Sequence, residues 1–195
     1  MDRGSRASYH LLHMKNLEFD AEKWTPVSKD HVVLSFLSSE WSRVRANASR
    51  LLIDNPNVDD RFQNNARTKL LWEIRGGLLR DIPEQTEWFA VRFLRPRHLD
   101  GLHAIRFGEW NSPADMNELQ KVTLRRPETL KDASNIESWE PILWGHSRIG
   151  PFTIIEGNHR LTALAGVPKL RDIKMLAYVG LCPGICRWHR PDHPA

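Results

Sequence analysis

The pattern of apolar positions predicts two helices in the first eighty residues. From Ser28 onward, apolar residues recur at steps of three and four, as on one face of an amphipathic helix. Ser28 is a suitable N-cap for this helix, and the Asn-Pro-Asn sequence at residues 55–57 ends it. A second run with a spacing of four predicts a helix from Asp59 to Arg80, whose last turn is weakened by the glycines at residues 76–77.

Beyond residue 83 the pattern changes to short segments. Residues 87–94 alternate between the two faces of a strand and are rich in aromatic and β-branched side chains, which predicts a strand. The further predicted strands are residues 141–144, 152–156 and 173–179, and the further predicted helices are residues 98–107, a segment starting at Ser112-Pro113, and residues 158–165.

These elements divide the chain into an N-terminal helical extension over residues 1–83 and a core over residues 84–195. Within the extension, residues 1–24 are polar and weakly patterned, as in an arm. In the core, the order strand, turn, strand, helix, strand predicts a small mixed sheet of the α/β (α+β) class. The 195 residues, 41% of them hydrophobic, are enough to bury a core without disulfides.

Composition and charge exclude several classes of protein. No run of about 18 apolar residues is present, which predicts no membrane-spanning helix. The first residues lack the apolar segment of a secretory signal, so we expect a cytoplasmic protein without a membrane partner. Two cysteines are too few for a disulfide framework. The net charge of +4 is spread along the chain, which favours small anionic ligands over nucleic acid.

The clearest candidate site is the Glu-Gly-Asn-His-Arg sequence at residues 156–160, between a predicted strand and a predicted helix. Gly157 permits a tight turn, and Asn158 is expected to cap the helix. The N–H groups at a helix N-terminus and the helix dipole form an anion site that suits a phosphate. His159 and Arg160 can add charge-assisted contacts to that phosphate.

Glu156 adds a carboxylate to this turn. It lies at the carboxyl end of a predicted strand, where open α/β sheets place their ligands. Beside a bound phosphate, such a carboxylate can hold Mg²⁺ or accept a proton from a substrate hydroxyl. The alternative is an ordinary turn and helix cap with His159 and Arg160 as surface residues, and the five residues alone leave both interpretations open.

Residues 139–180 resemble the ParB/sulfiredoxin-like superfamily around this turn. The family's free serine kinases read Asp-Gly-His-His-Arg, so that Glu156 takes the acidic position, Gly157, His159 and Arg160 match, and Asn158 replaces a His. Sulfiredoxins read Gly-Cys-His-Arg, and Asn158 stands where their catalytic Cys would be. ParB CTPases read Gly-Glu-Arg-Arg, of which only Gly157 and Arg160 match.

The resemblance implies a turn that binds nucleotide phosphates. Without a thiolate at position 158, sulfinic acid reduction is not expected. Only 15 residues follow Gly180 in the 195-residue chain, too few for the helix-turn-helix domain of a chromosome-partitioning protein. The serine kinases are therefore the nearest branch, and their acidic residue implies that Glu156 activates an acceptor hydroxyl.

The expected function is a phosphotransferase that uses ATP, or another nucleoside di- or triphosphate, with Mg²⁺ and a small hydroxyl-bearing acceptor. Glu156 and His159 are the candidate catalytic residues, Glu156 is also the candidate Mg²⁺ ligand, and Gly157, Asn158, His159 and Arg160 hold the phosphate. Two alternatives remain open: a nucleotide-sensing or protein-interaction module without turnover, and a ParB-like nuclease. The absence of a second visible carboxylate cluster counts against a two-metal nuclease.

Three smaller groups of residues also carry candidate chemistry. Tetrahedral zinc binding is one interpretation of the C-terminal set Cys182, Cys186, His189 and His193, although their short spacing favours a structural tail. Trp139 or Trp144 can either stack on a base or belong to the core, and the core is favoured. The remaining candidates are His146, expected to be an exposed turn residue, and Arg92, Arg95 and Arg97, which either reach a phosphate or are solvated.

Overall fold

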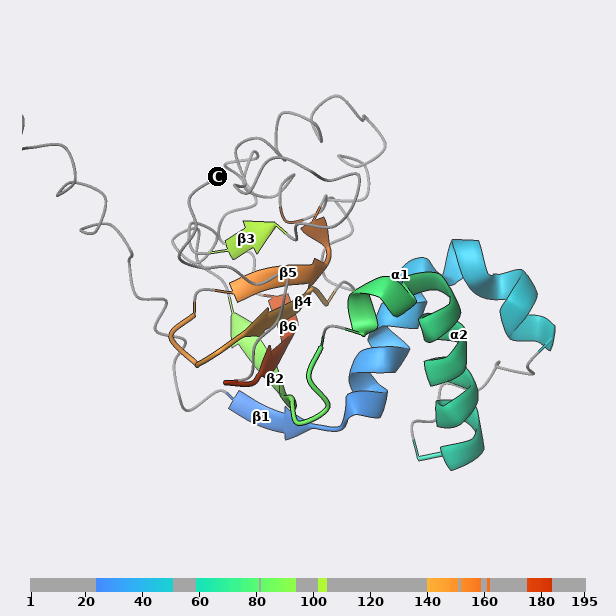
Figure 1. Ribbon diagram of the computed structural model, residues 1–195, viewed down its shortest axis with the longest axis horizontal. Coiled ribbons are helices and arrows are strands. Elements are labelled where there is room, and N and C mark those ends of the chain that lie inside the picture. Colours follow the sequence, from blue (N-terminus) through green and yellow to red (C-terminus); the bar gives the residue numbers. More distant parts are fainter. Residues whose placement is uncertain are drawn as a thin grey trace, which may run out of the picture.

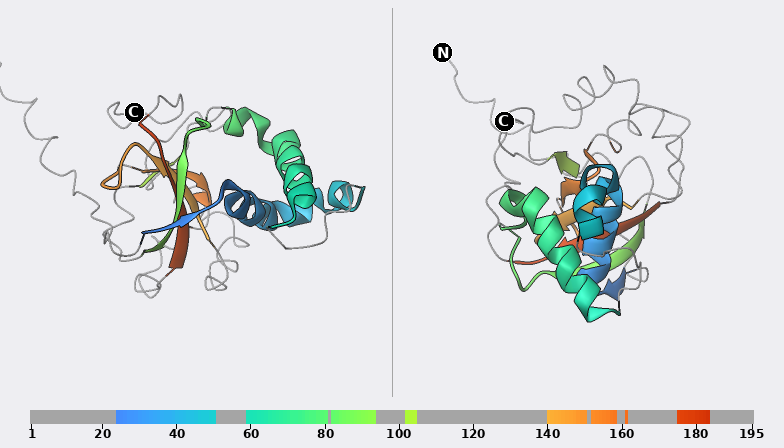
Figure 2. Two further views of the ribbon diagram at one scale, coloured as in Figure 1. Left: turned by 90° about the horizontal axis from the view of Figure 1, so that it is seen from below. Right: turned by 90° about the vertical axis from the view of Figure 1, so that its right-hand side faces the viewer.

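A computed structural model of the protein describes residues 24–50, 59–80, 82–93, 102–104, 140–150, 152–158, 161 and 175–183. Within these residues the elements are β1 (Trp24–Val27), α1 (Lys29–Arg50), α2 (Arg61–Leu79), β2 (Glu87–Phe93), β3 (Leu102–Ala104), β4 (Ile142–Gly145), β5 (Phe152–Glu156) and β6 (Met175–Leu181). The six strands form one sheet in the order β1-β2-β6-β4-β5-β3, and both helices lie on one side of it (Figures 1 and 2).

The sheet is mixed. β4 runs parallel to β6, and β3 runs parallel to β5, whereas the other neighbouring pairs are antiparallel. This arrangement agrees with the predicted mixed class of α and β structure. Among the described residues, no helix combines the length and the apolar character needed to cross a membrane.

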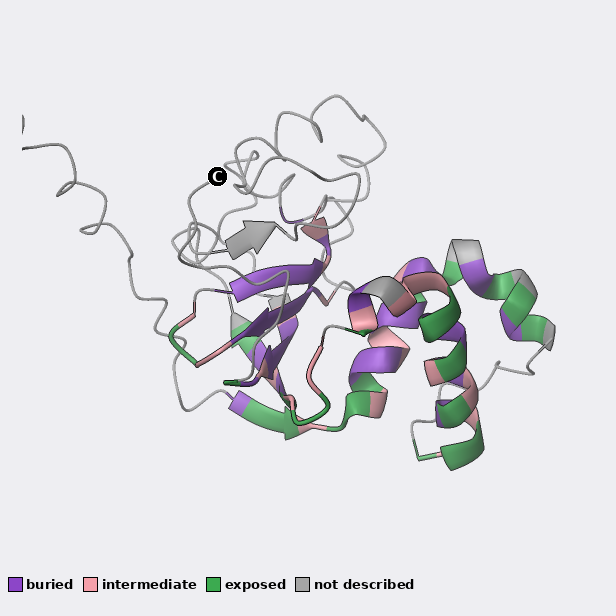
Figure 3. Ribbon diagram, viewed as in Figure 1, coloured by how far each residue is buried: buried purple, intermediate pink, exposed green. Residues whose placement is uncertain are grey.

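The strand register places apolar residues in rows across the sheet. One row runs from Phe89 through Val179 and Leu143 to Ile154, all of them buried. Paired residues in neighbouring strands point to the same face, so this row forms one continuous apolar surface. Figure 3 shows the resulting burial along the central strands.

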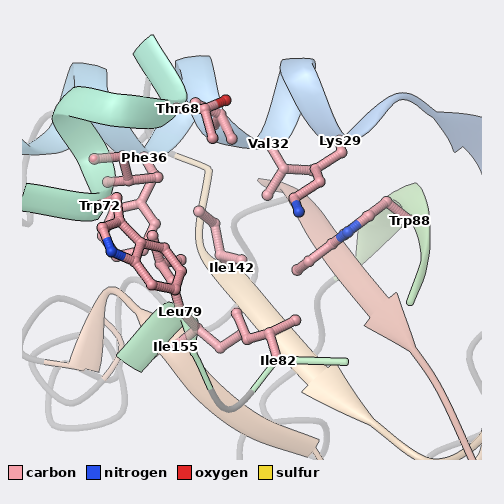
Figure 4. Close-up of a pocket in the computed structure, with 12 residues that line it drawn as sticks. Lys29, Val32, Phe36, Thr68, Trp72, Leu79, Ile82, Trp88, Ile142 and Ile155 are labelled. Carbon is pink, nitrogen blue, oxygen red and sulfur yellow. The ribbon is translucent and has the colours of Figure 1, made fainter. Parts of the chain in front are cut away.

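The opposite face of the sheet carries the side chains that contact the helices (Figure 4). A single buried cluster joins Phe36 of α1 and Leu71 of α2 to Trp88, Ile142 and Ile155 of the sheet. Burying one large apolar side chain stabilises a fold by roughly 1.5–3 kcal/mol, so this cluster is a main source of stability. Strand β1 and the buried cluster both cross the boundary drawn at residue 83, because β1 belongs to the sheet and the cluster joins both helices to it.

Both helices begin as their sequences indicate. The N–H of His31 donates to the Ser28 carbonyl at 3.1 Å and to the Ser28 hydroxyl at 3.4 Å, so Ser28 caps α1 as predicted. At α2, the Asp60 carboxylate accepts from the N–H of Gln63 at 3.1 Å. Arg75, directly before the two glycines, leaves the helical conformation with φ −133°, as their weakening effect predicts.

Polar contacts between the two helices show how they align. The Asn64 side chain donates to Asp30 at 3.2 Å, and Arg75 forms an ion pair with Glu40. From the first of these contacts to the second, the position moves ten residues forward along α1 and eleven residues forward along α2. Both helices therefore run in the same direction over this stretch. The fully buried Arg67 donates from Nη1 to the Asn64 side-chain oxygen at 2.7 Å, which gives this nitrogen of the guanidinium group an acceptor.

Two strands differ from the sequence prediction. No strand is predicted before residue 87, yet β1 pairs with β2, and the helix predicted over residues 98–107 is wrong at β3. β1 exposes Thr25 and Pro26 at the sheet edge, so it lacks the alternation of a buried strand. β3 has only three residues and is defined by its pairing with β5, which no local pattern reveals. The segment starting at residue 112 lies outside the described residues.

Candidate functional site

The predicted strand-to-helix turn is present at the end of β5. Glu156 is the last residue of the strand, and Gly157 follows with φ +99°, a left-handed conformation that favours glycine. The N–H of Leu161 donates to the carbonyl of Gly157 at 2.9 Å, which closes a first helical turn. The chain therefore changes from strand to helix within one buried glycine.

The helix cap differs from the prediction by one residue. Because the Gly157 carbonyl accepts the first helical hydrogen bond, Gly157 occupies the N-cap position and Asn158 is already helical. The Asn158 side-chain amide instead donates back to the carbonyl of Ile154 at 3.3 Å. Asn158 thus ties the turn to β5, and the prediction that it caps the helix is wrong.

Glu156 lies beside the first residue of β4. The register pairs it with Ile142, at a register shift between Ile142 and Leu143, and pairs Ile142 in turn with Tyr178 of β6. Glu156 as a whole residue is half-buried. Mg²⁺ sites commonly combine one or two carboxylates with substrate phosphates and water, and a half-buried Glu156 fits that donor set.

Tyr178 and Glu140 add a second polar pair at this end of the sheet. Burial, the charge of Glu140 and a hydrogen bond to its carboxylate together raise the pKa of Tyr178 to about 12. The protonated phenol is the donor in this hydrogen bond, and the shift extends its protonated range to higher pH. Sequence reasoning missed this pair, although a lone tyrosine in the apolar run of residues 175–181 is the signal that could have found it.

The remaining residues of the predicted site lie outside the described residues. These are His159 and Arg160, as well as Trp139, Arg95, Arg97, Cys186, His189 and His193. The structure therefore brings together Glu156, Gly157 and Asn158 of the predicted site. Within the described ranges, no three His, Cys, Asp or Glu residues are grouped so that they could hold a metal ion.

The structure places Trp144 in the core. Its side chain is fully buried, and its indole N–H donates to the Thr86 hydroxyl at 3.3 Å, so it is not available for stacking on a base. Its ring also meets the His146 ring edge-on, with 5.1 Å between centroids. His146 is half-buried and its Nδ1 bonds the carbonyl of Cys182 at 3.1 Å, so its predicted exposure is wrong.

Arg92 is exposed at the same end of the sheet as Glu156 but belongs to a distant strand. β2 and β5 are separated by β6 and β4. At roughly 4.8 Å between neighbouring strands, β2 and β5 lie about 14 Å apart. Arg92 is therefore poorly placed to share one phosphate with the turn after β5.

No protein-family model, curated protein or solved structure matches this chain.

Proposed function

We propose that the protein binds a nucleoside di- or triphosphate with Mg²⁺ at the turn of residues 156–160 and transfers a phosphoryl group to a small hydroxyl-bearing acceptor. One observation carries this proposal: the left-handed Gly157 joins the end of β5 directly to a helical turn, with the carboxylate of Glu156 immediately before it. N–H groups ahead of the first hydrogen bond of a helix can serve an anion, and a neighbouring carboxylate can serve a metal or a proton.

The chemistry assigned to the turn follows from these positions. The acceptor oxygen attacks the terminal phosphorus, its proton passes to Glu156, and the bond to the shortened nucleotide breaks. Bound Mg²⁺ neutralises charge on the phosphate oxygens. Gly157 lets the backbone approach the phosphate closely because it has no side chain. His159 and Arg160 are assigned charge-assisted contacts to the phosphate by their place in the sequence.

We expect the variant Glu156→Gln to lose turnover but still to bind nucleotide. Removing a general base lowers the rate of a proton-transfer step by roughly 10²–10⁴-fold, and the amide keeps the size of the side chain. We therefore expect a fall of that order in kcat, measured as formation of the nucleotide shortened by one phosphate, with free serine and related small hydroxyl compounds as acceptors. Nucleotide binding, measured by calorimetry, is expected to change by less than tenfold.

A matched control is available at the other end of the sheet. Glu87 is exposed and pairs with Leu181, in the row that also holds Phe152 at the start of β5. Glu87→Gln makes the same change of charge and should retain full activity. Full activity in Glu156→Gln would remove the assigned role of Glu156, whereas nucleotide binding without turnover in the wild type would favour the nucleotide-sensing alternative.

A further inference from the structure

We draw no further inference here: the strongest candidate, the pair of carboxylates that Glu140 and Glu156 place at the end of the sheet where β4 begins and β5 ends, belongs to the site already described, and the hydrogen bond that Glu140 accepts from Tyr178 lies within that cluster and points to no further ligand.

Discussion

Tyr178 carries a polar group into the core that the helices share with the sheet. Its side chain is 8% exposed, and its phenol donates a hydrogen bond to the carboxylate of Glu140, just ahead of β4. A buried phenol without a hydrogen-bond acceptor would destabilise the fold, and the Glu140 carboxylate supplies that acceptor. Burial opposes ionisation of the phenol most strongly, and the charge of the Glu140 carboxylate and the hydrogen bond to it add to this effect, so the pKa of Tyr178 rises from 10.0 to about 12.

This shift predicts a specific dependence of stability on pH. Below pH 10 the phenol is protonated in both the folded and the unfolded chain, and the stabilisation is complete. As pH rises from 10 toward 12, the unfolded chain releases the proton while the folded chain retains it, so the free energy of unfolding falls, by at most roughly 3 kcal/mol for two pKa units.

Tyr178→Phe isolates that contribution. Urea unfolding of the wild type and the variant at pH 8, 9.5, 11 and 12 should show a difference in stability that is largest below pH 10 and shrinks above it. Comparing the two proteins cancels the titration of lysines, which occurs in the same range. A difference that stays constant from pH 8 to pH 12 would contradict the assigned pKa and its cause.

At the scale of elements, the packing of β6 between β2 and β4 depends on a glycine. The register places Gly180 between Trp88 on one side and Trp144 on the other. A Cβ added to Gly180 would lie 2.8 Å from the Thr86 methyl group and 2.8 Å from the Trp88 ring. The Trp88 ring therefore covers the backbone of β6 at Gly180 and occupies the space that a side chain at this position would need.

Gly180→Ala is accordingly expected to destabilise the fold by roughly 1–3 kcal/mol, the usual cost of overpacking a core. The midpoint of urea unfolding measures this effect. Gly76→Ala is the control, because its added Cβ would lie 3.4 Å from the Trp72 indole, an ordinary contact, in a helix that favours alanine. Equal stability of Gly180→Ala and the wild type would show that the Trp88 ring moves aside easily.

The elements also show what can be predicted from the chain alone. α1 and α2 carry their own periodicity and caps, and β5 has the residues predicted for it. β1 and β3 were missed because their assignment depends on strands distant in sequence. At the turn, the glycine was predictable from its conformational freedom, but the shift of the cap from Asn158 to Gly157 depends on a hydrogen bond to Ile154.

In the molecule as a whole, the helices and the sheet enclose one core. The turn after β5 was predictable because its residues are consecutive in the sequence. The shared core was not, since its members come from both helices and from strands β2, β4, β5 and β6. Tyr178 and Glu140 were missed for the same reason: 38 positions separate residue 140 from residue 178 in the sequence, and only the fold joins them.

The proposed function requires that the turn of residues 156–160 holds a nucleotide phosphate. The most direct measurement is thermal unfolding of the wild type and His159→Ala with ATP, ADP, CTP or GTP, each with Mg²⁺. At a ligand concentration of about 100 Kd, binding adds roughly 2.7 kcal/mol, which corresponds to a rise in Tm of about 5–10 °C for a chain of this size. We expect such a rise with at least one nucleotide in the wild type and its loss in His159→Ala. No rise with any nucleotide in the wild type would contradict it.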